Sequence, residues 1–205
     1  MNLNKLKEAE QNILELYPGG FKHPEMEILV KKHKPDKMFA LAQESFALAK
    51  FDQPQEIVEA MAKIVSRSSM VSLFEKPKFR DFSKTLNKSE TEQLADGLKI
   101  FLYENEEPGF NMILDILQKG KLAKWSLISV WFAYFSPDYQ VFVKPTTAKG
   151  IIKNFDVEGL IYKPTPSYAF YKSYRELINS MKENVDKSLS PSNPAFSGFL
   201  MMSMG

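Results

Sequence analysis

The stretch Trp125-Ser126-Leu127-Ile128-Ser129-Val130-Trp131-Phe132-Ala133-Tyr134-Phe135 decides the fold. Only two serines interrupt its apolar character, so a helix over residues 125–135 would be apolar on nearly every side. Such a helix is usually buried on most of its surface. It is also too short to cross a bilayer, which needs about 20 apolar residues. We therefore expect it at the centre of a helical core, and we expect no membrane span.

Helical spacing of apolar residues dominates the chain before this stretch. A first helix should end at Pro18-Gly19-Gly20, because proline and glycine do not continue a helix. A second should run from Pro24 to His33, since proline suits the first helical turn. The phrase Ser89-Glu90-Thr91-Glu92 predicts a capping box at the start of another. The pattern predicts a mainly α protein, a compact multi-helix bundle around residues 125–135.

The period changes after Phe135. Residues 140–143 and 160–162 have the composition of short strands. Each is followed by proline, which lacks the N–H group that a sheet would need. We expect a minimal two-stranded β element here, of either parallel or antiparallel pairing. Ser167 should then cap a long helix from Tyr168 to about Glu183.

The chain is long enough for a substantial core, with 205 residues of which 44% are hydrophobic. We expect one helical domain over residues 1–187, followed by a proline-containing tail over 188–205. The tail ends in an apolar patch that includes Phe199, Leu200 and Met201. A free apolar patch would be unusual. It should dock on its own chain or on a second one, and self-association through these three residues is the open alternative.

The composition excludes several kinds of chemistry. The chain has no cysteine, which removes thiol nucleophiles, disulfides and thiolate metal sites. No motif for a serine nucleophile, a dinucleotide, a nucleoside triphosphate or zinc is present. We therefore expect no metal and no cofactor. The N-terminal residues lack the apolar segment of a signal peptide, which favours a cytoplasmic protein.

Two phrases repeat one pattern: Val143-Lys144-Pro145-Thr146 and Tyr162-Lys163-Pro164-Thr165. In each, an expected strand ends, a lysine follows, and a threonine or its neighbour, Thr147 or Ser167, would cap a helix. Free amides and the helix dipole favour an anion at such a position. Lys144, Thr146, Lys163 and Thr165 are therefore candidates for one anion-binding site. The alternative is that threonine caps, proline terminates and lysine is solvated, without a ligand.

Residues 119–182 contain half of the aromatic side chains and an excess of lysine and arginine over acidic residues. Aromatic faces combined with cations are what single-strand nucleic-acid binders use. The basic aromatic face of 144–175 could serve this purpose. The competing interpretation is that most of these rings belong to the core.

The segments Phe135 to Thr146 and Tyr162 to Tyr168 resemble a recurring part of a family of uncharacterised bacterial proteins. The resemblance covers the C-terminal third and implies a bacterial, cytoplasmic protein with no assigned activity. Together with the missing catalytic motifs, it leads us to expect a non-enzymatic binding or interaction protein. The alternatives are a nucleic-acid-associated accessory protein, and an enzyme or sensor that binds a phosphorylated small molecule at the Lys-Pro-Thr turns.

Overall fold

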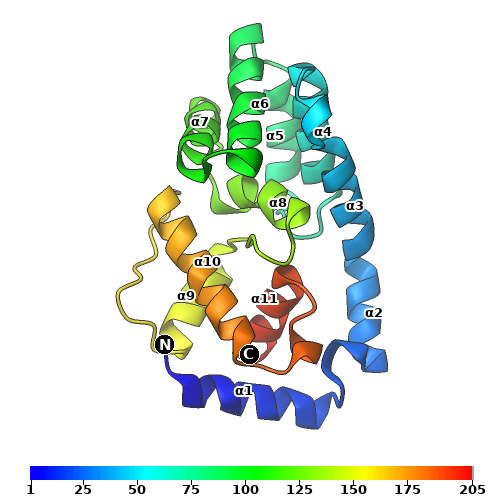
Figure 1. Ribbon diagram of the computed structural model, residues 1–205, viewed down its shortest axis with the longest axis vertical. Coiled ribbons are helices and arrows are strands. Elements are labelled where there is room, and N and C mark those ends of the chain that lie inside the picture. Colours follow the sequence, from blue (N-terminus) through cyan, green and yellow to red (C-terminus); the bar gives the residue numbers. More distant parts are fainter. Residues whose placement is uncertain (205) are drawn as a thin grey trace.

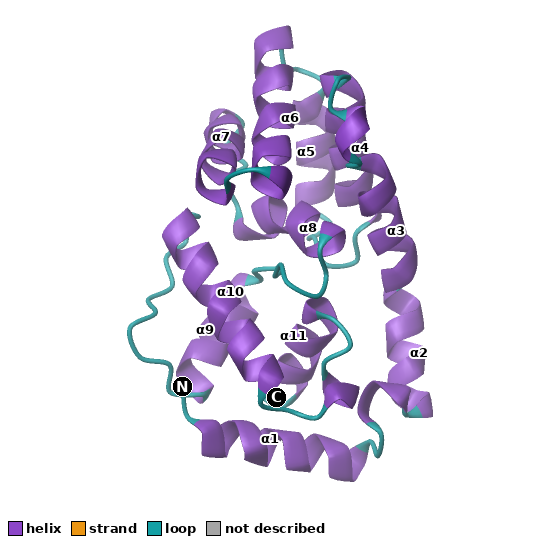
Figure 2. Ribbon diagram, viewed as in Figure 1, coloured by secondary structure: helices purple, strands orange, loops and turns teal. Residues whose placement is uncertain are grey.

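The computed structural model describes residues 1–204, and these contain helices and connecting segments but no strand (Figure 2). The α-helices are α1 (Leu3–Leu16), α2 (Pro24–His33), α3 (Pro35–Ser45), α4 (Pro54–Arg67), α5 (Glu75–Ser83), α6 (Lys88–Tyr103), α7 (Glu106–Lys119), α8 (Trp125–Phe135), α9 (Pro145–Asn154), α10 (Tyr168–Glu183) and α11 (Asn193–Met202). The 3-10 turns are η1 (Gly20–Lys22), η2 (Leu48–Lys50) and η3 (Lys187–Leu189). Within the described residues, no helix is both long enough and apolar enough to cross a membrane.

The helices form two groups along the long axis of the molecule. Figure 1 shows α4, α5, α6 and α7 at one end, and α1, α9, α10 and α11 at the other. Helix α8 lies between the groups, and α2 and α3 run along one side from one group to the other. The mainly helical class is confirmed. The arrangement is two groups joined through α8, which differs from the expected single bundle around it.

Helix α8 has the expected bounds and is buried over residues 125–134. Trp131 and Phe132 are fully enclosed. The Phe132 ring stacks on Phe101 of α6 with the centroids 3.5 Å apart. The Trp131 indole N–H, which needs a partner once buried, donates to the Met61 carbonyl at 3.1 Å. Burial thus joins α8 to α4 and α6.

The expected β element is absent from the described residues. The segment at 140–143 is extended but pairs with side chains: the Val143 N–H donates to Ser129 Oγ of α8 at 2.9 Å. Asn193 Nδ2 of α11 donates to the Gln140 carbonyl at 3.1 Å. Residues 160–162 lie in the irregular connection between α9 and α10. Because side chains from neighbouring helices satisfy the first segment, it needs no second strand.

The cap of helix α6 lies two residues before the expected one. Asn87, not Ser89, is the cap: Asn87 Oδ1 accepts from the Glu90 N–H at 3.0 Å, and Glu90 Oε2 accepts from the Asn87 N–H at 3.2 Å. Asparagine caps a helix as well as serine does. In the expected box Ser89 would pair with Glu92, whereas the observed box pairs Asn87 with Glu90.

The C-terminal segment folds back on its own chain. Helix α11 packs against α9 and α10, and Phe196, Phe199 and Leu200 are fully buried. Met201 is 47% exposed. Of the two possibilities stated above, docking on the same chain is the one observed. Phe199 and Leu200 are therefore not accessible to a second chain, whereas Met201 is.

Two helical glycines give a matched test of this structure. A Cβ on Gly109 of α7 would press on backbone atoms of α6, including the Gly97 carbonyl at 2.6 Å. A Cβ on Gly198 of α11 would meet nothing within 4 Å. Gly109→Ala should lower the free energy of unfolding by about 1–3 kcal/mol through steric overlap. Gly198→Ala should raise it by about 0.5–1 kcal/mol, since alanine is the better helix former. Urea denaturation measures both, and equal effects would contradict the close approach of α6 and α7.

Candidate functional site

A cavity of about 650 Å³ lies between α2 and α11. These two helices face each other across the lower half of Figure 1. The volume falls within the roughly 300–1,000 Å³ of small-molecule sites.

Each bounding helix turns one face to the cavity. On α2 the lining residues recur at three- and four-residue spacing: Met26, Leu29, Val30 and His33. On α11 the same spacing gives Ala195, Gly198, Met201 and Met202. Residues at this spacing share one side of a helix. The other face of α11 carries its buried side chains, so this helix has one face in the core and one on the cavity.

The inner wall comes from α3, α8 and the extended segment. Phe39, Tyr134 and Phe142 line it, with Phe39 packed against Tyr134 at 6.1 Å between ring centroids. The Tyr134 hydroxyl bonds Ser68 Oγ at 2.9 Å. Burial raises the pKa of Tyr134 even though hydrogen bonds with Ser68 and Ser69 lower it. The phenol is therefore neutral at physiological pH and belongs to the wall.

A close backbone contact closes one edge of the cavity. Gly20 of η1 has φ 58°, and a Cβ there would lie 2.7 Å from the Ser188 carbonyl of η3. Only glycine allows this backbone conformation and this approach together. The contact sets the position of α2, which follows η1, relative to α11, which follows η3.

The charged residues at the cavity are mostly basic. Three lysines line it, Lys22, Lys144 and Lys187, against one acid, Asp36. His33 lies at the rim and its Nδ1 is 2.8 Å from Ser69 Oγ. With histidine neutral, the site carries a positive excess, which favours an anionic group on any occupant.

Two hydroxyl groups at the cavity lack partners in the described part of the chain. Thr147 of α9 is only 7% exposed and lines the cavity, yet no hydrogen bond of its hydroxyl is found within residues 1–204. Ser197 Oγ of α11 is buried and equally without a partner there. Buried polar groups are normally hydrogen-bonded. Ser197 Oγ is an exception to this rule, whereas the Thr147 hydroxyl is not fully enclosed and is free to bond an occupant of the cavity.

The two Lys-Pro-Thr phrases adopt different structures. Lys144 is the N-terminal cap residue of α9, and Thr147 rather than Thr146 faces the cavity. Neither threonine caps, because no side-chain hydrogen bond closes this helix end within the described residues. The first phrase therefore leads directly into a helix.

Lys163 and Thr165 lie in the irregular segment before α10, and Ser167 caps that helix. The Lys163 carbonyl accepts from the Trp125 indole N–H at 2.8 Å. Within the described residues neither lysine side chain forms a hydrogen bond or an ion pair. An anion site shared by Lys144, Thr146, Lys163 and Thr165 remains a prediction.

The aromatic residues of 119–182 are mostly core. Those that are buried are Trp125, Trp131, Phe132, Tyr134, Phe142, Phe155, Phe170, Tyr171 and Tyr174. Tyr139 is 54% exposed, and the Arg175 guanidinium lies 4.5 Å from its ring centroid. Buried rings cannot stack on bases in this conformation. The nucleic-acid interpretation loses most of the stacking surface on which it depends.

A buried ion pair joins the two groups of helices, and the sequence analysis missed it. Arg175 of α10 is 3% exposed and forms two hydrogen bonds with Glu106 of α7, at 2.6 and 2.7 Å. Gln140 and Tyr168 also donate to the Glu106 carboxylate. The neighbouring acidic residues Glu104 and Glu107 would predict a solvated acidic turn for Glu106, and the structure differs from that prediction. The two partners are 69 residues apart, so no local pattern connects them.

The pKa values follow from this pair. Burial alone would raise the pKa of Glu106, but hydrogen bonds from Arg175, Gln140 and Tyr168 outweigh it and hold the pKa below its ordinary value. Burial and the Glu106 carboxylate together raise the pKa of Tyr168 to about 12. Glu106 is thus ionised and Tyr168 neutral over the physiological range.

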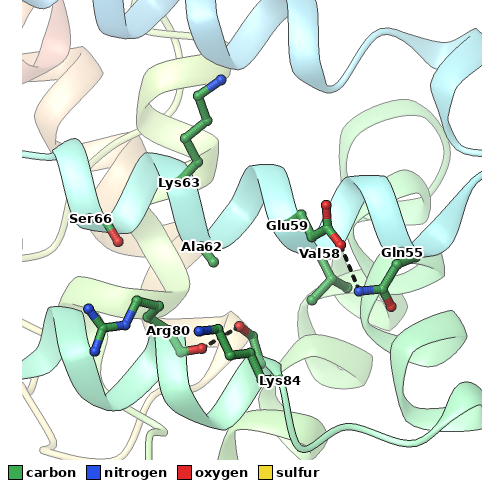
Figure 3. Close-up of a pocket in the computed structure, with 9 residues that line it drawn as sticks. Gln55, Val58, Glu59, Ala62, Lys63, Ser66, Arg80 and Lys84 are labelled. Carbon is green, nitrogen blue, oxygen red and sulfur yellow. Dashed lines mark hydrogen bonds between the residues drawn. The ribbon is translucent and has the colours of Figure 1, made fainter.

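A second, smaller hollow of about 370 Å³ lies between α4 and α5 (Figure 3). Its polar residues include Glu59, Lys63, Arg80 and Lys84. Figure 3 shows Lys63 pointing away from Arg80 and Lys84, so the cations do not converge. The Arg80 guanidinium is also paired with Asp81 at 2.9 Å. This hollow has no arrangement that would select a ligand.

The ion pair generates a prediction about stability and pH. Glu106→Gln should lower the free energy of unfolding by about 3 kcal/mol at pH 7, because it leaves the Arg175 charge buried and unpaired. Since the folded pKa of Glu106 is depressed, its contribution is present above the ordinary value of 4.5 and disappears as the pH falls through the folded pKa. Urea titrations at neutral and strongly acidic pH test this, with the exposed neighbour Glu107→Gln as the control. Equal losses for the two variants at pH 7 would rule out the proposed role of the pair.

Comparison of the chain with protein-family models, with curated proteins and with solved structures finds no match. The resemblance to an uncharacterised bacterial family therefore stays a prediction. The function has to be inferred from the cavity and from the side chains that line it.

Proposed function

We propose that the protein is a non-enzymatic binding protein that takes a predominantly apolar small molecule into the cavity between α2 and α11. One observation carries the proposal. On α2 and on α11 the lining residues recur at three- and four-residue spacing, so one face of each helix borders a shared space of about 650 Å³. Apolar surface left in water is unfavourable, so an apolar occupant would be stabilised there.

The nature of the wall supports this function. Four of its side chains are methionines: Met26, Met70, Met201 and Met202. Methionine is unbranched and polarisable, so it adapts to the shape of what it contacts. Leu29 of α2 is 44% exposed and Met201 of α11 47% exposed. An occupant would cover both, and their side chains would follow its outline.

One pair in the cavity has the residue types of a nucleophile and a base. Ser69 Oγ and His33 Nδ1 are within hydrogen-bonding distance. Nucleophilic catalysis also needs a group that orients the imidazole. The described contacts of His33 include no such group. We infer that this hydrogen bond holds the segment after α4 against the end of α2. It thereby fixes the rim of the cavity.

A fluorescent probe tests the proposed function. The uncharged dye N-phenyl-1-naphthylamine should bind the wild-type protein with enhanced emission, because the cavity removes it from water. Gly198→Phe should weaken this binding by at least about tenfold, since the added ring would occupy part of the cavity. Emission titrations measure the affinity, and thermal melts verify that each variant is folded.

Two controls accompany the probe experiment. Gly198→Ala adds only one carbon at the same position and should leave binding nearly unchanged. Ala169→Phe places the same ring on the exposed surface of α10, away from the cavity. If a folded Gly198→Phe variant binds the dye as tightly as the wild-type protein, the cavity is not the binding site and the proposal is wrong.

A further inference from the structure

We propose that the natural ligand of this cavity is an anionic amphiphile, with an apolar chain between α2 and α11 and a carboxylate or phosphate head group beside Lys144 and Thr147 at the start of α9. This inference rests on the proposed function and adds the chemical class and the orientation of the ligand.

The first step is the charge. Lys144 and Lys187 line the cavity and form no ion pair within residues 1–204. The charge of Lys22 is compensated in part by the carboxylate of Asp186, whose pKa Lys22 helps to lower. Asp36 is the only acidic residue of the lining. An uncharged apolar ligand would leave this positive excess without a counterpart, whereas an anionic head group would neutralise it.

The second step is the end of α9. Its cap residue, Lys144, offers no side-chain acceptor, and the first intrahelical bond is donated by Ala148 to the Lys144 carbonyl at 2.8 Å. The amides of Thr146 and Thr147 precede that bond. Amides of the first turn have no intrahelical acceptor, and the helix dipole places positive potential in front of them. Lys144 itself is exposed and lines the cavity, so the residue that begins this helix adds a full positive charge to the site.

The third step is Thr147, which points to a ligand independently of the helix end. Its side chain is 93% buried, lines the cavity and has no hydrogen-bond partner among the described residues. A hydroxyl in this state can donate directly to a carboxylate or phosphate oxygen. Lys144 and Thr147 both line the cavity and both belong to the start of α9, and we call this part of the wall the polar corner.

The remaining geometry gives the ligand its direction. Phe142 lies two residues before Lys144 and also lines the cavity, so the apolar wall begins next to the polar corner. From there the space extends between the apolar faces of α2 and α11. A molecule with one anionic end and a flexible hydrocarbon chain matches this order of surfaces. The chemistry at the corner is common to fatty acids and to alkyl phosphates.

Three ligands with the same chain test the proposal on the full-length protein: dodecanoate, dodecyl phosphate and dodecanol. Calorimetric titration below micellar concentrations should give at least about tenfold tighter binding for one or both anions than for the alcohol. The stronger of the two anions identifies the head group. Lys144→Met should remove this preference, measured as the ratio of the anion affinity to the dodecanol affinity of the same variant. Thr147→Val, which keeps the side-chain volume, should reduce the preference by several fold.

Lys163→Met is the matched control, because Lys163 occupies the same place in the second Lys-Pro-Thr phrase but does not line the cavity. It should leave all three affinities unchanged. Equal binding of the anions and the alcohol would overturn the inference while the proposed function stands. An anion preference that survives Lys144→Met would also overturn it. If neither dodecanol nor the uncharged dye binds, the proposed function itself is wrong.

Discussion

The extended backbone after α8 has to satisfy its hydrogen bonds without a sheet, and much of the fold depends on how it does so. Ser129 of α8 accepts from the Val143 N–H, and Asn193 of α11 donates to the Tyr139 and Gln140 carbonyls. The Tyr171 hydroxyl of α10 donates to the Val141 carbonyl at 3.3 Å. Three helices thus converge on one short segment. Because unpaired buried backbone groups are unfavourable, these contacts hold the two groups of helices together.

The same segment brings the buried charges together. Gln140 accepts a hydrogen bond from Arg175 and donates one to Glu106, so it contacts both partners of the ion pair. A buried pair is stable only when its remaining hydrogen-bonding groups are also satisfied. Gln140 and Tyr168 do this for the carboxylate, whereas Arg175 Nε has no partner among the described residues. The pair is therefore best understood as a structural clamp between α7 and α10, placed beside the segment that leads to the cavity.

The cavity is the space that these contacts leave between α2 and α11. The extended segment contributes Phe142 to the wall and ends at Lys144, where α9 begins. Helix α11 is held by the buried face that includes Phe199 and by Asn193, so its other face is free to line the space. Helix α2 contacts mainly η1 and contributes only Met26 to the buried core. Its apolar face finds no helix to pack on, which is why an apolar ligand is the occupant that the arrangement favours.

The sequence by itself determined the helical class, the bounds of α2 and α8, and the burial of Trp131 and Phe132. These depend on local terms, namely apolar periodicity, proline at first turns and an apolar stretch without a polar side. Lys144 was also identified as a place where an anion could bind, since the start of a helix is a local feature. Its partner there, Thr147, was considered only as a cap.

Only the tertiary structure decided the rest. The segment at 140–143 has strand composition, but side chains of α8, α10 and α11 supply its hydrogen bonds, and it pairs with no strand among the described residues. Local sequence would predict a solvated turn for Glu106. Its partner Arg175 lies far along the chain, and only the fold brings the two together. Lys144 and Lys163 share a phrase but not a structure, because only the first leads directly into a helix. The cavity exists only once α2 and α11, at opposite ends of the sequence, are placed face to face, and such long-range placement has no local signal.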